Sequence, residues 1–211
     1  QTKTKMKKSL FALSILTLAA CGTPQPGNDS DSSKTENVEV CNYSIASDSA
    51  TVYWEAYKLS NKIGVGGKFD SLSVSIKESA TSVKELLEYS SIEVFTESVN
   101  SKDEVRDGKL KDFFFAAMEV PSQINGRIIS VEGDNMAGTA KTEFTMNNQQ
   151  QTIDLVYSVN EGELKLTGSI DILSFGADKA FADLGKACEE KHTGPDKVAK
   201  LWPDVKVNFF A

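Results

Sequence analysis

"MAGTAKTEFTMNNQQQTIDLVYSVNEGELKLTGSIDI", residues 136–172, carries the clearest structural signal in the chain. Apolar or small side chains occupy every second position in three successive runs, 136–146, 153–159 and 164–172. A period of two is typical of strands that bury one face. The polar segments NNQQQ and NEGE separate the runs and are typical of turns. The stretch therefore predicts three long antiparallel strands joined by short turns.

The same alternation extends on either side of this stretch. It recurs from about residue 50 onward, in residues 52–56, 63–69, 72–76, 129–131 and 205–209. Long strands that follow one another and bury one face favour a sheet that closes on itself, because closure removes its exposed edges. We predict an all-β fold, an antiparallel eight-stranded β-barrel.

Three segments do not show a simple alternation. Residues 82–92 predict a short helix, and residues 177–192 predict another, because apolar side chains fall on one helical stripe in each. "VRDGKLKDFFF", residues 105–115, predicts an exposed turn at Asp107-Gly108 followed by a strand. Adjacent phenylalanines in a strand point to both faces, so we expect one face to meet the barrel interior and the other a covering helix.

The glycine-rich stretch "KIGVGGKFDSL", residues 62–72, resembles a phosphate-binding loop at first sight. Such a loop needs a strand before it, a helix after it, and Lys-Ser or Lys-Thr at its end. Here Phe69 follows Lys68, and alternation continues to Ile76, so a strand follows instead of a helix. The sequence therefore excludes nucleotide binding, and Gly66 and Gly67 predict a bend or bulge in the barrel wall, or space over a pocket.

The N-terminal segment has the features of an export signal. Lysines precede the apolar run "LFALSILTLAA", which is too short to span a bilayer comfortably. "LAAC", residues 18–21, resembles the lipobox of bacterial lipoproteins, in which the cysteine is acylated. We therefore predict a lipoprotein signal peptide over residues 1–20, lipid attachment at Cys21, and a position in the bacterial cell envelope, periplasmic or associated with the outer membrane.

Residues 21–40 are rich in Gly, Pro, Ser and acidic residues and have little to bury. We expect a disordered tether there, followed by a folded domain over residues 41–211. The domain holds two cysteines, Cys41 and Cys188, and in an oxidising compartment an even pair predicts a disulfide. Closing so long a loop would stabilise the fold by about 4–5 kcal/mol. The alternative is a pair of free buried thiols.

The composition offers little for catalysis. The chain has a formal net charge of −7, which argues against nucleic acid as a partner. Its single histidine, His192, lies at a helix end among acidic residues, where a solvated turn is the simpler interpretation. No nucleophile motif and no Cys-x-x-Cys motif is present. We expect no metal, no cofactor and no enzymatic activity, with an enzyme or redox protein that uses Cys41 and Cys188, or His192, as the alternative.

Several motifs resemble the YceI-like family, which comprises small exported lipocalin-like antiparallel β-barrels. The matching segments run in order through residues 48–210: "VYWEAYK" (52–58), "VGGKFDSLSVSI" (65–76), "VRDGKLKDFFF" (105–115), "FTMNNQQQTIDLVY" (144–157) and "ILSFGAD" (172–178). The segment at 105–115 is the most specific of them. Asn148 stands where the family usually has a hairpin glycine, which Asn can replace because it tolerates the left-handed conformation. Thr152 stands where proline is common, and "VPSQINGRI" lacks the aromatic residue of the family's pattern.

The resemblance implies a long apolar tunnel that holds a polyisoprenoid or another long-chain lipid. We expect a polar head group at the tunnel mouth near Arg106 or Lys109, and an N-terminal lipid anchor in the membrane. The residues expected to face the interior are Val52, Trp54, Ala56, Val65, Gly67, Phe69, Phe114, Ile129, Val131, Phe144, Leu155, Leu166 and Ile170.

The predicted interior mixes small and large side chains, which fits either an open tunnel or a filled core, since a barrel of eight strands permits both. With a filled interior, the protein would be an envelope scaffold or interaction module, with Tyr53 and Tyr57 as an exposed aromatic patch. A homodimer stays open on the sequence alone.

Overall fold

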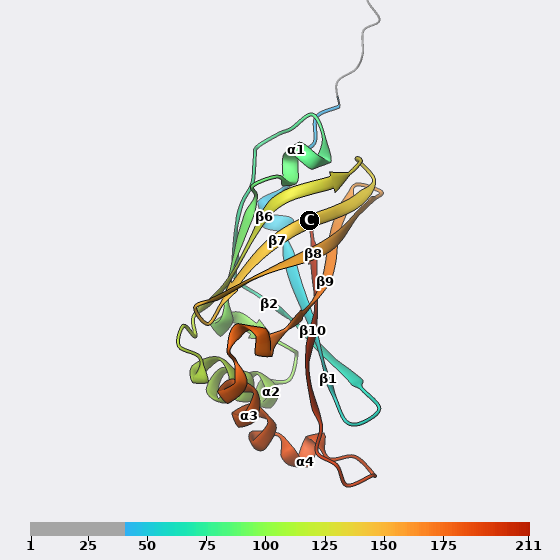
Figure 1. Cartoon of the computed structure of the whole chain (residues 1–211). Coiled ribbons are helices and arrows are strands. Elements are labelled where there is room, and N and C mark those ends of the chain that lie inside the picture. The colour runs from blue at the N-terminus through green and yellow to red at the C-terminus, as the bar shows by residue number, and fades with distance from the viewer. Residues whose placement is uncertain (1–40) are drawn as a thin grey trace, which may run out of the picture. The chain divides into compact units, whose positions relative to one another are not determined.

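A single antiparallel sheet of ten strands dominates the computed structural model, which describes residues 41–211 (Figure 1). The strands lie side by side in the order β3-β4-β6-β7-β8-β9-β10-β1-β2-β5. They comprise β1 (Thr51–Lys58), β2 (Ile63–Phe69), β3 (Leu72–Ser75), β4 (Ser91–Phe95), β5 (Val99–Asn100), β6 (Gln123–Gly133), β7 (Ala137–Met146), β8 (Gln149–Asn160), β9 (Glu163–Asp171) and β10 (Leu201–Phe210). The predicted all-β, antiparallel, barrel-like fold is confirmed.

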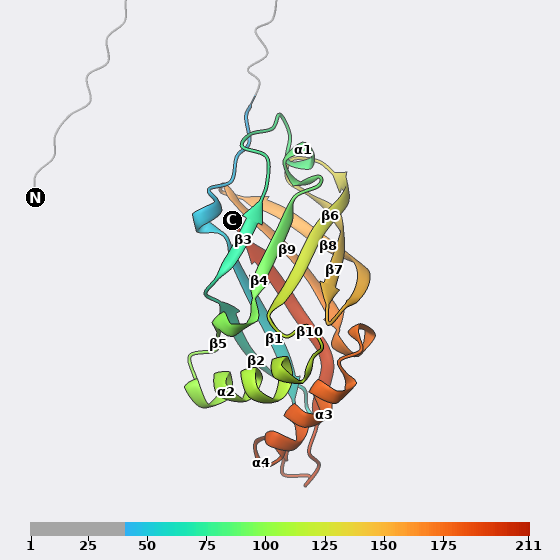
Figure 2. The ribbon, with the colours of Figure 1, turned by 90° about the vertical axis from the view of Figure 1, so that its left-hand side faces the viewer.

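The number of strands differs from the predicted eight, and two short strands explain the difference. Helix α1 (Val83–Leu87) has only five residues, so β4 begins inside the segment predicted to be helical. Strand β5 has two residues and is too short to show an alternating pattern. Strands β3 and β5 stand at the two ends of the strand order. Figure 2 shows that the described sheet curls into a barrel-like form.

The segment at 105–115 is helical, and the predicted turn and strand are wrong. It forms α2 (Glu104–Lys109), a π-helical turn η3 (Leu110–Phe114) and the 3₁₀ turn η4 (Phe115–Ala117). Asp103 starts this helix, because its side chain accepts a hydrogen bond from the Arg106 backbone N–H at 3.1 Å. The helical spacing buries Phe114 and Phe115, whereas Phe113 is 43% exposed.

The helices gather at two ends of the sheet (Figure 1). Helix α1 lies at one end, and α2, α3 (Asp178–Ala187) and α4 (Glu189–His192) lie at the other, so we call these the α1 end and the α3 end. The helices predicted at 82–92 and 177–192 are therefore present, the first shorter and the second divided in two. Three further 3₁₀ turns are η1 (Ser47–Ser49), η2 (Thr96–Ser98) and η5 (Ile172–Phe175).

The turn between β7 and β8 confirms that asparagine can replace glycine there. Asn147 and Asn148 have positive φ angles of 52° and 58°. The buried Asn147 side chain also donates hydrogen bonds to the carbonyls of Phe175 and Gly176 and accepts one from the Glu119 N–H. The turn thus fastens the sheet to the segment that leads into α3.

The two cysteines of the domain are not joined. Both are free, with Cys41 exposed and Cys188 buried. Cys41 lies near the β-bridge between Tyr43 and Ala80 at the α1 end, whereas Cys188 lies between α3 and α4 at the opposite end (Figure 1). The predicted disulfide is therefore wrong, because the two cysteines lie at opposite ends of the folded domain.

The predicted signal peptide at 1–20, the tether at 21–40 and the lipid-attachment residue Cys21 lie outside the described residues. From residue 41 to the end, no helix is both long enough and apolar enough to cross a membrane.

Candidate lipid-binding interior

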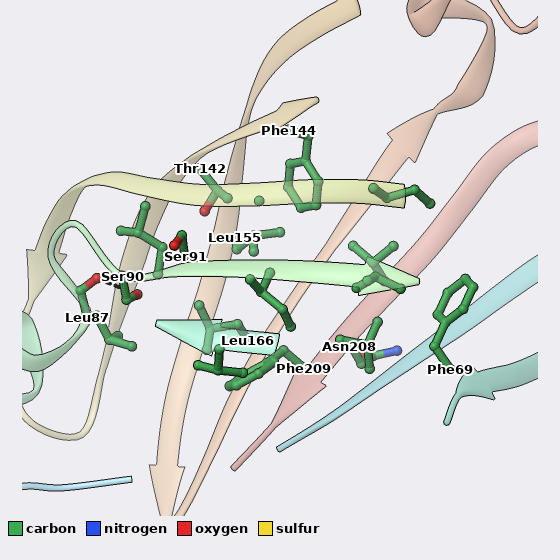
Figure 3. A pocket seen from close by; sticks show the side chains of 18 of the residues that line it. Phe69, Leu87, Ser90, Ser91, Thr142, Phe144, Leu155, Leu166, Asn208 and Phe209 are labelled. Carbon is green, nitrogen blue, oxygen red and sulfur yellow. Dashed lines mark hydrogen bonds between the residues drawn. The ribbon is translucent and has the colours of Figure 1, made fainter. Parts of the chain in front are cut away.

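An apolar cavity of about 130 Å³ lies inside the curled sheet on the side of the α1 end (Figure 3). We call it the barrel cavity. Among the described residues, none of those that line it is charged. Seven of the predicted interior residues line it: Val52, Trp54, Phe69, Phe144, Leu155, Leu166 and Ile170. The strand alternation thus correctly places most of these side chains on the inner face.

Three of the polar side chains in the wall of the barrel cavity have a hydrogen-bond partner within the fold. Ser90 Oγ donates to the Leu87 carbonyl at 2.7 Å, and Thr142 Oγ1 donates to the Ala140 carbonyl at 3.1 Å. Asn208 Oδ1 accepts from Thr167 Oγ1 at 2.8 Å. Because most of its lining is apolar and none of the described lining residues is charged, the barrel cavity is suited to a hydrocarbon rather than to a polar ligand.

A second apolar cavity of about 110 Å³ lies beneath the helices of the α3 end, and we call it the helix-covered cavity. Phe114 and Phe115 reach it from η3 and η4, and Phe181 and Leu184 reach it from α3. It shares five wall residues with the barrel cavity: Trp54, Phe69, Ile124, Ile170 and Val207. The two apolar cavities are therefore neighbours separated by side chains.

A third cavity of about 410 Å³, the basic pocket, adjoins the helix-covered cavity and differs from it in charge. Its charged lining consists of Lys58, Arg106, Lys109, Lys191 and a single carboxylate, Asp103. Its apolar lining includes Ala56, Leu110, Leu184 and Leu201, all shared with the helix-covered cavity. The three cavities therefore form a row with the charge at one end.

Among the described residues, Trp54 alone lines all three cavities. Its side chain is 9% exposed, and its Nε1 has no hydrogen-bond partner within residues 41–211. Gly67 lies beside the ring in the paired strand β2, where a Cβ atom would come within 2.6 Å of Trp54 Cζ2. The pairing of β1 with β2 runs without a register shift, so Gly67 provides room for the Trp54 ring and does not mark a bulge.

Four further predicted interior residues lie elsewhere than the barrel cavity. Ala56 and Phe114 line the helix-covered cavity, and Val65 lines the basic pocket. Val131 is buried in the core and lines none of the three cavities.

The expected inward position of Ile129 is wrong. A register shift between Ile128 and Ser130 places Ile129 at a β-bulge, and Ile128 lines the barrel cavity instead. A bulge moves the following residues to the opposite phase, so uninterrupted alternation misplaces them.

The sequence did not predict that β4 and the start of β6 line the barrel cavity. Ile92, Val94 and Ile124 line the barrel cavity, and the first two belong to a strand that follows a helix almost without a break. The sequence also did not predict Lys58 and Lys191 in the basic pocket, and Lys191 lies in none of the motifs. The only available signal for Lys58 was its place at the end of the "VYWEAYK" strand.

Burial governs the titration of the groups at the basic pocket. It lowers the pKa of His192, and the nearby Lys58 and Lys109 lower it further. Burial also raises the pKa of the Cys188 thiol, although Lys109, Lys58 and Arg106 oppose this. A protonated, buried thiol is a poor nucleophile. No group of three or more His, Cys, Asp or Glu within residues 41–211 is placed to hold a metal ion.

The two tyrosines considered for an exposed patch differ in their surroundings. Tyr53 is 44% exposed and packs edge to face against Phe210, with ring centroids 5.7 Å apart. Tyr57 is half-buried, lies beneath the Lys62 ammonium and lines the basic pocket. The two rings therefore do not present one equivalent surface.

A curled antiparallel sheet around a mainly apolar interior, with the charged lining residues at one end, is a lipocalin-like, barrel-like fold. The family model of the YceI-like domain matches residues 43–209, and the chain belongs to this family. No protein of curated function matches the chain in sequence.

Solved structures share the fold at low sequence identity. A polyisoprenoid binding domain from Saccharophagus degradans, described as implicated in plant cell wall breakdown, is 14% identical, with a TM-score of 0.58 over 82% of this chain and 97% of its own. BcnA from Burkholderia cenocepacia is 10% identical, with a TM-score of 0.51 over 76% and 94% of the two chains. The YceI protein of Campylobacter jejuni is 20% identical, with a TM-score of 0.51 over 68% and 81%.

Proposed function

We propose that the protein binds a long-chain lipid or polyisoprenoid inside the sheet and acts as a carrier, store or sensor, without catalysis. The row of three cavities, with charge only at its end, is the observation that carries this proposal. Membership of the YceI-like family and the likeness to a polyisoprenoid binding domain support it. Each CH₂ buried in such an interior contributes about 0.8 kcal/mol, so affinity should rise with chain length.

A chain that occupies the whole row has to pass the side chains that divide it. Trp54 and Phe69 line both apolar cavities, so we expect these rings to turn when a long ligand is bound. Because the cavities already exist on both sides, the movement needed is local to these side chains.

We further propose that the domain acts at the bacterial cell envelope, tethered through an acylated Cys21. The lipobox-like "LAAC" segment and the polar residues after it support this. Mass spectrometry of the mature protein should show a lipid-modified Cys21 as its first residue. An unmodified cysteine in the mature chain would contradict the proposal.

Native mass spectrometry of the protein purified from its own host tests the binding proposal. We expect a bound species with the mass of a long hydrocarbon chain. The variant Leu155→Phe fills the barrel cavity and should lose most of this species, whereas Val156→Phe should keep it, because Val156 is 57% exposed on the other face. Protein that is ligand-free, or equally loaded in both variants when both are folded, would contradict lipid binding in this interior.

A further inference from the structure

The wall of the barrel cavity is built from strands except at the α1 end. All but four of the described residues that line the cavity belong to strands of the sheet. Each of these strands is held by a neighbour through a backbone ladder, which fixes its side chains in the wall. The four others are Ile45, Ile76, Leu87 and Ser90, and Figure 3 shows Leu87 and Ser90 at one edge of the cavity. The α1 end is therefore the part of the wall that is most able to move.

Residues 43–50, which we call the strap, lead into β1 and contribute to the wall at this end. An isolated β-bridge holds the strap, in which Tyr43 and Ala80 exchange backbone hydrogen bonds with N···O distances of 2.8 and 2.9 Å. The ladder between β1 and β2 begins only at the pair of Val52 with Phe69. The strap is therefore fastened at the bridge and again where β1 begins.

The strap lies along a free edge of the sheet. Strand β3 stands at one end of the strand order, so its outer edge pairs with no other strand that the structure describes. Within the described part of the chain, no backbone hydrogen bond joins residues 44–50 to residues 70–79. Val74 and Ile76 line the cavity on the β3 side, and Ile45 lines it from the strap. Side chains close the wall at this place without a ladder.

The strap is held less firmly than α1, which also faces the cavity. Val83, Leu86 and Leu87 of α1 are each at most 3% exposed. The Val83 backbone N–H donates to Asn135 Oδ1 at 2.9 Å and so fixes the helix to the turn between β6 and β7. By contrast, residues 41–46 are all exposed or half-buried. Segments with few buried contacts and few backbone bonds open at the lowest free energy, so the strap should open before α1 does.

A long chain needs such a movement, because the apolar interior is small. The barrel cavity and the helix-covered cavity have volumes of about 130 and 110 Å³. Pockets that enclose drug-sized ligands have volumes of roughly 300–1,000 Å³. A chain that has filled both cavities meets Ile45 at the α1 end. Any further length of that chain has to displace the strap or stay outside the barrel.

We propose that the strap is a displaceable stop that makes the α1 end a determinant of chain-length specificity. It stays in place over a ligand that ends within the barrel cavity. A longer chain displaces it and leaves the barrel between the strap and β3. The proposal rests on the proposed lipid-binding function and adds to it a selective exit at one end of the interior.

A disulfide that locks the strap tests this. In a Cys41→Ser background, Tyr43→Cys/Ala80→Cys places thiols on the two residues of the bridge. The Cα atoms of such a hydrogen-bonded antiparallel pair lie about 5.5 Å apart, which a disulfide can span. The probes are farnesol and solanesol, two isoprenoid alcohols of which solanesol has a much longer chain. Oxidation should weaken solanesol at least about tenfold and farnesol less than about twofold, because excluding two methylene groups already costs about tenfold in affinity.

The matched control is a lock at the α3 end, Thr193→Cys/Ala199→Cys in the same background. Thr193 and Ala199 form a second isolated β-bridge, are both exposed, and line none of the three cavities. Oxidation of this control should change the binding of neither alcohol. Native mass spectrometry measures binding and verifies each intended disulfide, and thermal melts verify that the oxidised and reduced forms are folded.

Hydrogen exchange tests the same movement in the unmodified protein. The amide protons of Tyr43 and Ala80 form the bridge, so both should exchange at least about tenfold faster with solanesol bound than with farnesol bound. The amide proton of Val83, which is bonded to Asn135, should exchange at the same rate with either alcohol.

Each other result overturns the proposal in a distinguishable way. Equal solanesol binding by the oxidised and reduced strap lock, or equal exchange of the bridge amides with both alcohols, would show that the strap stays closed around a long chain. Equal losses for both alcohols would show that the strap admits every chain and selects none. Equal losses in the two locks would show an effect of the disulfide itself. If the unmodified protein binds neither alcohol, the proposed lipid-binding function itself fails.

Discussion

The barrel cavity and the basic pocket stand at opposite ends of one row of cavities, and within residues 41–211 Trp54 alone lines both. Strands build the first, and no described residue in its wall is charged. The end of β1 and three short helical segments build much of the second, and they bring four cations to it. On the proposed lipid-binding function, the uncharged cavity would bury the chain, and the charged pocket would face its polar end.

The largest expected effect comes from removing the side chain that divides the two ends. Trp54→Ala deletes a large, buried ring and should destabilise the domain by about 3–5 kcal/mol, measured by urea denaturation. Tyr53→Ala is the matched control on the outer face of the same strand, where the loss of one edge-to-face contact should cost about 1 kcal/mol. Equal losses in the free energy of unfolding would mean that the buried Trp54 ring stabilises the domain no more than the exposed Tyr53 ring does.

The next prediction concerns the room that Trp54 needs. Gly67→Val places side-chain atoms against the Trp54 ring and against the Asn100 carbonyl oxygen, which a Cβ would approach to 2.7 Å. Because a backbone oxygen cannot move aside easily, we expect a loss of about 2–3 kcal/mol and reduced lipid binding. Gly108→Ala, where a Cβ meets no atom within 4 Å, should be neutral or slightly stabilising. A Gly67→Val variant as stable as the parent would refute the close approach of Gly67 to the Trp54 ring and the Asn100 carbonyl oxygen.

Variants of the two cysteines allow the two ends of the domain to be compared, because one cysteine lies at each end. Cys188→Ser buries a hydroxyl in place of a thiol at the α3 end and should cost about 1–2 kcal/mol. Cys41→Ser should change the free energy of unfolding by less than about 0.5 kcal/mol, since Cys41 is exposed. Large, equal losses in both variants, removed by reducing agent, would indicate the disulfide that the structure lacks.

The smallest expected effect is the pH dependence at His192. Its pKa is lowered in the folded state, by burial first and then by Lys58 and Lys109, so the unfolded chain binds a proton more readily. This residue's contribution is fully present above the unfolded pKa of about 6.5 and is lost as pH falls through the folded pKa. Stability should therefore decline more on acidification in the parent than in His192→Gln. An identical dependence of the unfolding free energy on pH in the two proteins would show that folding does not lower the pKa of His192.

The fold could be predicted from the sequence as far as alternation reaches. Long strands such as β7, β8 and β9 bury one face, so the period of two in their sequence places Phe144, Leu155 and Leu166 correctly. Alternation fails where the backbone adds a residue, as at Ile129, or where an element is too short to repeat, as in β5.

The basic pocket could not be predicted in the same way. The stretch 105–115 alternates charge and turn residues like a loop, yet the Asp103 cap and packing against α3 make it helical. Lys58 and Lys191 are far apart in sequence and come together only because α4 folds back near the end of β1. Pairwise tertiary contacts of this kind leave no periodic trace in a single sequence.

The central claim is that one lipid occupies the row of cavities with its head at the α3 end. A crystal structure of the protein purified from its own host with its bound lipid tests this most directly. We expect elongated density that runs from the barrel cavity past a displaced Trp54 ring and ends in the basic pocket. Empty cavities with Trp54 unmoved, in protein shown by mass spectrometry to carry the lipid, would contradict it.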